Sequence, residues 1–135
     1  MTYRLPIKGI DYLLYNYPYL RREVESLDKS PGGIVMVPCR GVRRGSAVEV
    51  TAIERAELSM VLDAVERAWR SLTGDLKDIA RAKYRRGMRH SEIERRYFLS
   101  RATLSRKLST IRATVAGHLA LVPEAILRHF WAQIR

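Results

Sequence analysis

Basic side chains are concentrated in one stretch of this sequence, and this concentration indicates that the stretch binds an anion. Residues 81–112 contain eleven lysines and arginines but only two acidic residues, Glu92 and Glu94. At this density like charges repel one another unless an anion neutralises them, and nucleic acid is the commonest such anion. An anionic membrane surface and an acidic protein are the alternatives. The basic residues are Arg81, Lys83, Arg85, Arg86, Arg89, Arg95, Arg96, Arg101, Arg106, Lys107 and Arg112.

Residue types that usually perform catalysis or bind metals lack the spacing that either task needs. The three histidines show no metal-ligand spacing with the single cysteine, Cys39, and no phosphate-binding loop is present. Glu92 and Glu94 lie two positions apart, so on a helix they point to different faces and do not converge as an acid–base pair. A lone cysteine beside an apolar run is more often packed than reactive. We therefore expect no enzyme activity, no cofactor and no metal site.

The composition is that of one folded domain with an uneven charge distribution. The chain has 135 residues, a hydrophobic fraction of 47% and a formal net charge of +11. Residues 74–135 carry 14 basic and 5 acidic side chains, whereas residues 1–73 carry 11 and 9. One cysteine excludes an intrachain disulfide and suits a reducing compartment. No apolar run approaches the ~18 residues of a membrane-spanning helix, so we expect a cytoplasmic protein that does not enter membranes.

The first segment, residues 1–50, is expected to be helical at its start and to end in a basic connector. Residues 8–29 have helical apolar spacing, with a break expected near Pro18 and with Asn16 as the cap of the second piece. Four tyrosines lie in this region, and packing is a commoner role for them than stacking on bases. Residues 34–50 are expected to be extended or to form short strands. Their arginines (Arg40, Arg43 and Arg44) either touch phosphates or belong to a linker.

The second segment, residues 51–122, opens with the longest helix. Thr51 and Glu54 fit a capping box, in which the hydroxyl accepts a backbone N–H and the carboxylate reaches back to the cap. Apolar residues then recur every three or four positions to about Leu72. This pattern predicts an amphipathic helix over about 52–72.

Three further helices are expected in the same segment. The apolar spacing predicts them at 76–86, at about 91–97 and at 101–116, with a three-residue turn between the last two. The expected caps are Asp75, Ser91 in a second capping box with Glu94, and Ser100. A helix followed by a short helix, a tight turn and a third helix is the order of a helix-turn-helix. The sequence therefore predicts an all-α fold whose last helix of this unit enters a DNA groove.

The two faces of residues 101–116 differ in the way that a recognition helix requires. Leu104, Leu108 and Ile111 are expected to pack on the scaffold. Arginine bonds bidentately to guanine in the major groove, so polar residues on the other face are expected to read bases. The expected base-reading residues are Arg101, Ala102, Ser105 and Arg106. The residues expected to contact phosphates are Arg85, Arg86, Arg89, Arg95, Arg96, Ser100, Thr103 and Lys107.

The third segment, residues 123–135, is expected to form a short amphipathic helix after Pro123. Phe130, Trp131 and Ile134 lie on one apolar stripe. This stripe can cover the core of its own chain or form a dimer contact. We favour a homodimer, because proteins that read DNA gain by binding paired half-sites.

The stretch Leu76–Leu119 resembles region four of bacterial sigma factors, and it is closer still to phage late-gene transcriptional regulators of the RinA/ArpU type. The best-matching motifs are "AKYRRGMRHSEI" and "SRATLSRKL". The layout is also similar, because that family carries a "Y-P-x-L" segment, here Tyr17-Pro18-Tyr19-Leu20, ahead of the long helix. Two positions depart from the family. Glu94 replaces a small residue, and Phe98-Leu99 replaces a Gly-Ile turn.

The resemblance implies a function that the residues alone do not specify. It implies a sequence-specific regulator that binds double-stranded DNA, activates phage late genes and contacts RNA polymerase of the bacterial host. It also implies base reading by Arg101, Ala102, Ser105 and Arg106. Two alternatives stay open. One is the recognition subunit of a phage DNA-packaging machine, similar to a small terminase, and the other is a helical adaptor that binds an acidic protein.

Overall fold

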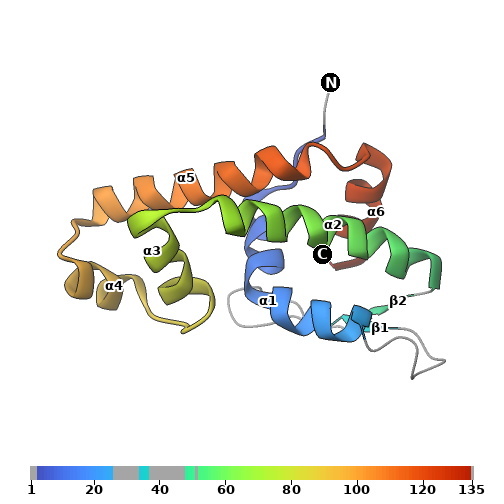
Figure 1. The fold of residues 1–135 in the computed structure, drawn as a ribbon, viewed down its shortest axis with the longest axis horizontal. Coiled ribbons are helices and arrows are strands. Elements are labelled where there is room, and N and C mark those ends of the chain that lie inside the picture. Colours follow the sequence, from blue (N-terminus) through green and yellow to red (C-terminus); the bar gives the residue numbers. More distant parts are fainter. Residues whose placement is uncertain (1–2, 26–33, 37–47, 51, 135) are drawn as a thin grey trace.

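The computed structural model describes residues 3–25, 34–36, 48–50 and 52–134. Within these ranges the chain forms six helices and one short pair of strands (Figure 1). The all-α prediction is therefore confirmed. The elements are α1 (Ile7–Glu25), β1 (Ile34–Met36), β2 (Val48–Val50), α2 (Ala52–Ser71), α3 (Gly74–Tyr84), α4 (His90–Tyr97), α5 (Arg101–Leu119) and α6 (Glu124–Ile134).

Helices α2 and α5 lie side by side and form the long central pair of the structure (Figure 1). They have 20 and 19 residues, so each is nearly 30 Å long. Helices α3 and α4 lie at one end of this pair, while α1, α6 and the two strands lie towards the other (Figure 1). Helix α1 packs on both α2 and α5, so it lies against the central pair.

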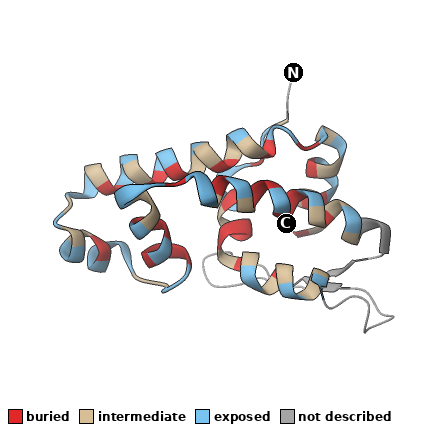
Figure 2. Cartoon of the chain, in the orientation of Figure 1, coloured by how far each residue is buried: buried red, intermediate tan, exposed pale blue. Residues whose placement is uncertain are grey.

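The predicted apolar faces of the long helices form the core. Buried residues concentrate along the line between α2 and α5 (Figure 2). On α2 these include Leu58, Val61 and Leu62, which recur at the predicted spacing. The predicted capping box at Thr51 cannot be compared, because Thr51 lies outside the described residues.

Helix α1 does not break at Pro18, and this part of the prediction is wrong. The helix runs without interruption from Ile7 to Glu25 with Pro18 inside it. Asn16 is not a cap either, because its side chain is buried and its Nδ2 donates to the Tyr12 carbonyl at 2.9 Å. Proline has no N–H to donate to the residue four positions earlier, so the carbonyl of Leu14 needs another donor. Arg85 supplies it.

Two predicted helix caps lie two residues later than the observed ones. Helix α3 begins at Gly74 with Thr73 as its cap, so Asp75 lies in the first turn. Helix α4 begins at His90, and the Glu92 carboxylate accepts the backbone N–H of Arg89 at 3.0 Å. The predicted pair of Ser91 and Glu94 is therefore displaced by two residues. Both helices therefore begin before the residue that was predicted to cap them.

The connector forms short strands where the sequence suggested them. β1 and β2 are antiparallel, with Ile34 opposite Val50 and Met36 opposite Val48. The basic residues expected to follow β1 (Arg40, Arg43 and Arg44), together with Cys39, lie outside the described residues.

The apolar stripe of α6 packs on the core of its own chain. Leu127, Phe130 and Ile134 are buried, and the rings of Phe130 and Tyr12 form an edge-to-face pair with centroids 6.2 Å apart. Trp131 approaches Gly9 so closely that a Cβ there would lie 3.1 Å from the indole. Core packing within one chain therefore explains the stripe, and the homodimer stays a prediction.

Candidate nucleic-acid interface

The turn between α4 and α5 consists of Phe98, Leu99 and Ser100. The backbone N–H groups of Phe98 and Leu99 both donate to the Glu94 carbonyl, the latter at 2.9 Å. Ser100 then caps α5 as predicted, because its Oγ accepts the Thr103 N–H at 3.1 Å. Hydrogen bonds on both sides of the turn thus fix where α5 begins relative to α4.

The two faces of α5 are separated as a groove-binding helix requires. Leu104, Leu108 and Ile111 are at most 2% exposed, and they pack towards the other helices. The four predicted base-reading residues are exposed, and so is the neighbouring Ser109. The four are Arg101, Ala102, Ser105 and Arg106. The polar face of α5 is therefore open to solvent along its first two turns.

Hydrogen bonds on the exposed face connect Ser100, the cap of α5, to Arg106 through Thr103. The Ser100 hydroxyl donates to Thr103 Oγ1 at 2.9 Å, and an Arg106 Nη donates to the same oxygen at 3.5 Å. The second contact is long and exposed, so it orients Arg106 only weakly. Ser100 and Thr103 therefore serve the helix start, and the Arg106 guanidinium keeps most of its donors for a ligand.

Exposed arginines also lie on the elements around α5. Besides Arg85, four of the residues expected to contact phosphates lie on α4 or on the connection before it, and all four are exposed. Among the described residues, none of the four is within ion-pairing distance of a carboxylate. Their positive charges are thus not neutralised within this part of the protein. These residues are Arg86, Arg89, Arg95 and Arg96.

Lys107 differs from those arginines because it already has an anionic partner. Its Nζ forms an ion pair with the Asp75 carboxylate on α3. The hydrogen bond from Lys107 holds the pKa of Asp75 below its ordinary value. A phosphate at this position would have to compete with Asp75 for the Lys107 ammonium.

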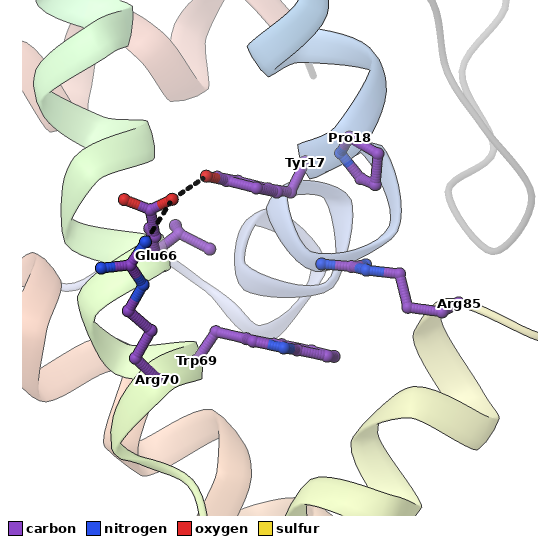
Figure 3. A pocket seen from close by; sticks show the side chains of 7 residues that line it. Tyr17, Pro18, Glu66, Trp69, Arg70 and Arg85 are labelled. Atoms are coloured by element: carbon purple, nitrogen blue, oxygen red, sulfur yellow. Dashed lines mark hydrogen bonds and ion pairs between the residues drawn. The ribbon is translucent and has the colours of Figure 1, made fainter.

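Arg85 lies in a pocket of about 220 Å³ between α1, α2 and the end of α3 (Figure 3). One Nη donates to the Leu14 carbonyl, and the guanidinium carbon lies 4.3 Å from the Trp69 ring centroid and 5.9 Å from that of Tyr17. Burial lowers the pKa of this guanidinium. The guanidinium of Arg85 thus already has partners on α1 and α2, and a phosphate would have to compete with them for it.

Arg112 is likewise held by contacts within the protein. Its Nε and one Nη donate to the two carboxylate oxygens of Asp11 at 3.1 and 3.2 Å, and the Tyr84 hydroxyl donates to Asp11 at 2.7 Å. Burial, together with the Asp11 charge, raises the pKa of the Tyr84 hydroxyl. Burial opposes the charge of Arg112, but the hydrogen bond to Asp11 still raises its pKa. This triad ties α1 to α3 and α5.

Lys83 is the fourth basic residue that the fold uses. It is 8% exposed. Its Nζ donates to the Tyr15 hydroxyl at 3.0 Å and lies 3.2 Å from His90 Nε2. The same ammonium faces the rings of Tyr15 and Tyr84 at 5.4 and 5.3 Å. Burial and then the charges of Lys83 and Arg112 lower the pKa of His90.

The basic stretch therefore contains two groups of residues with different roles. Lys83, Arg85, Lys107 and Arg112 have partners within the protein. The remaining seven of the eleven are exposed, and none of them forms an ion pair within the described residues. The sequence could not separate the groups, because the partners of the first one lie far away along the chain. The exposed residues are Arg81, Arg86, Arg89, Arg95, Arg96, Arg101 and Arg106.

A hollow of about 390 Å³ lies between α4 and α5, beside the exposed face. His90, Ser91 and Glu94 line it from α4, and Arg101 and Ser105 are among the α5 residues that line it. The exposed face of α5 is thus bordered by a concave strip. The start of α4 forms the opposite wall of this strip.

In the described part of the chain, no three His, Cys, Asp or Glu side chains come close enough to hold a metal ion. Among the described helices, none combines the length and the apolar character that crossing a bilayer requires.

Comparison of the chain with known protein families, with curated proteins and with solved structures found no match.

Proposed function

We propose that this protein is a sequence-specific regulator of transcription that binds double-stranded DNA through α5. The observation that carries the proposal is the separation of faces on that helix. Arg101 and Arg106 are exposed on one side, while Leu104 is buried on the other. A helix that reads bases must expose polar side chains on one face and be held rigidly by its other face.

The spacing of the exposed residues suits a major groove. Arg101 and Arg106 are five residues apart, which corresponds to about 7.5 Å along the helix axis. Successive base pairs are about 3.4 Å apart, so the two guanidinium groups span about two base-pair steps. Each can bond bidentately to a guanine. Ala102 and Ser105 lie between them and are small enough to let the helix approach the base edges.

The order of the elements supports the same function. The short α4 and the three-residue turn lead directly into α5, and α3 and α4 both pack against α5. This is the order of a helix-turn-helix. The exposed arginines of α4 and of the connection before it are available for phosphates, which position a protein on the duplex without reading sequence.

We further propose that the protein activates phage late genes and contacts RNA polymerase. Both proposals rest on the resemblance of residues 76–119 to RinA/ArpU-type regulators. We also propose that the protein is a homodimer, because proteins that read DNA gain by binding paired half-sites.

The test is selection of duplexes from a random pool with the full-length protein, followed by binding measurements on the enriched sequence. We expect one enriched motif, and binding that weakens steeply with salt because phosphate contacts release counterions. A reporter driven by a promoter that carries this motif would then test activation. Ring-shaped assemblies in solution would favour a packaging subunit. Failure to bind any duplex at low salt would contradict the proposal and favour an adaptor for an acidic protein.

A further inference from the structure

Phe98, in the turn before α5, combines two features that seldom occur together. Its backbone is left-handed, with φ 55° and ψ 49°, and it is the one non-glycine residue with positive φ among the described residues. Its exposed fraction is 94%. A bulky residue in this conformation is strained, and an aromatic ring this exposed gains almost nothing from burial.

The fold explains the backbone conformation of Phe98, but it does not explain why a phenylalanine occupies this position. The N–H groups of Phe98 and Leu99 both donate to the Glu94 carbonyl, so backbone hydrogen bonds impose the conformation. Glycine would adopt it without strain and would leave those bonds intact. The ring of Phe98 is too exposed to pack on the core. The choice of phenylalanine therefore costs stability in the isolated chain, and strain of this kind is concentrated at functional sites.

The charges around Phe98 indicate what its ring meets. Arg95 and Arg96 precede it and Arg101 follows it, and all three are exposed. An apolar protein surface, including a second copy of this chain, would bury these cations without counterions, which is costly. Duplex DNA offers phosphates to the arginines and apolar groups to the ring, namely thymine methyl groups in the major groove and the faces of the deoxyriboses. Phe98 also lies two residues before Ser100, the cap of α5.

We propose that Phe98 is an apolar anchor on duplex DNA, placed beside the start of the recognition helix. This inference rests on the proposed function, because it requires α5 to lie in a groove. The ring contacts the apolar surface of the duplex next to the bases that Arg101 reads. In the free protein the same ring is held exposed by the left-handed turn, so no rearrangement is needed before binding.

The test compares Phe98→Gly and Phe98→Ala on an enriched duplex of about 20 base pairs. Both variants remove the ring, so both should bind about five- to tenfold more weakly. Phe98→Gly also removes the strain, so its Tm should rise by about 2–4 °C, whereas Phe98→Ala keeps a Cβ and should leave Tm nearly unchanged. The matched control is Leu121→Ser, since Leu121 is 74% exposed beyond the other end of α5. It should bind as the wild type does.

Two further measurements identify the contact. An apolar contact releases no counterions, so neither Phe98 variant should change the slope of log K against log salt. Deoxyuridine in place of thymidine removes only the methyl group. If wild-type binding weakens on that duplex and the variants do not weaken further, the ring meets a thymine methyl. If wild-type binding is unchanged and the variants still bind weakly, it meets deoxyribose.

Two outcomes overturn the inference in distinguishable ways. If a motif is enriched but both Phe98 variants bind it like the wild type, the anchor is refuted while the proposed function stands, and a protein partner for Phe98 becomes the better explanation. If the wild-type protein binds no duplex even at low salt, the proposed function and the anchor fail together.

Discussion

Arg85 donates a hydrogen bond to the carbonyl oxygen of Leu14, across 71 positions of sequence. That carbonyl lies four residues before Pro18, which has no N–H to offer it. A guanidinium from the end of α3 thus replaces the missing bond of α1, and it stacks on Trp69 of α2 at 4.3 Å. One basic side chain therefore holds three helices together at the position where the proline would otherwise weaken the first of them.

The first prediction tests this relationship by stability. Arg85→Ala should lower the free energy of unfolding by about 2 kcal/mol, because it removes a hydrogen bond and a cation–π contact and leaves a carbonyl unsatisfied. In a Pro18→Ala background the backbone N–H at position 18 returns, so the same substitution should cost less. Chemical denaturation of the four proteins measures this coupling. Equal costs in both backgrounds would contradict the link between Arg85 and Pro18.

The sequence predicted helices, their buried faces and the cap of α5, because these depend on local spacing. Periodic apolar residues placed α2 and α5 within a few residues of their observed limits. The local pattern around Pro18 predicted a break that the structure does not have. The helix continues there because Arg85, which is distant in sequence, donates to the Leu14 carbonyl.

The roles of the basic residues could not be predicted for the same physical reason. Asp11 and Arg112 are separated by 101 positions, and Tyr15 and Lys83 by 68. Nothing in the local pattern around Arg112 marks it as different from Arg106. Only the packing of α1 against α5 shows that one guanidinium is neutralised inside the protein and the other is exposed.

The second prediction concerns the triad of Asp11, Tyr84 and Arg112. Asp11→Ala leaves the Arg112 guanidinium without its counterion at a site where the two side chains are 17% and 21% exposed. We expect a loss of about 3 kcal/mol in unfolding free energy. The double variant Asp11→Ala/Arg112→Met should recover part of it, because no unpaired charge remains. Asp63→Ala is the control, since Asp63 is 51% exposed in its ion pair with Arg21 and should cost less than about 1 kcal/mol.

The third prediction is a pH dependence of stability that comes from His90. The pKa of His90 is lowered by burial and by the charges of Lys83 and Arg112. The unfolded chain therefore binds a proton at a higher pH than the folded chain does, so stability should fall as the pH drops below about 6.5. His90→Gln keeps a polar side chain but cannot titrate, and it should lose stability less steeply between about pH 7.5 and about pH 5.5. Thermal melts across this range measure the effect, and parallel curves for the two proteins would refute it.

The fourth prediction concerns the ion pair between Lys107 and Asp75. Asp75→Asn frees the Lys107 ammonium and removes a negative charge close to α5. Affinity for any duplex should therefore increase, and the slope of log K against log salt should steepen by about 0.9. The Asp75 side chain is 59% exposed, so the unfolding free energy should change by less than about 1 kcal/mol. Asp78→Asn on the same helix is the matched control for the change in net charge. If it has the same effect as Asp75→Asn, general electrostatics rather than the release of Lys107 would be responsible.

The fifth prediction separates base reading from phosphate binding on α5. Arg106→Ala should weaken binding to the enriched motif by about 1–3 kcal/mol, because a bidentate contact to guanine is lost. It should weaken binding to unrelated duplexes much less. Lys107→Ala should weaken both kinds of binding to the same small extent, since Lys107 does not read bases and its charge is already partly neutralised by Asp75.

Arg85→Ala provides the control for that comparison, because its guanidinium is already bonded to Leu14 and stacked on Trp69. At a temperature where the variant stays folded, it should bind both duplexes like the wild type and keep the wild-type salt slope. Fluorescence anisotropy at four or more salt concentrations separates the ionic and base-specific parts of each loss. If Arg106→Ala and Lys107→Ala lose the same affinity on the motif and on unrelated duplexes, α5 binds phosphates but does not read sequence. The assignment of Arg106 would then be wrong, even though the protein binds DNA.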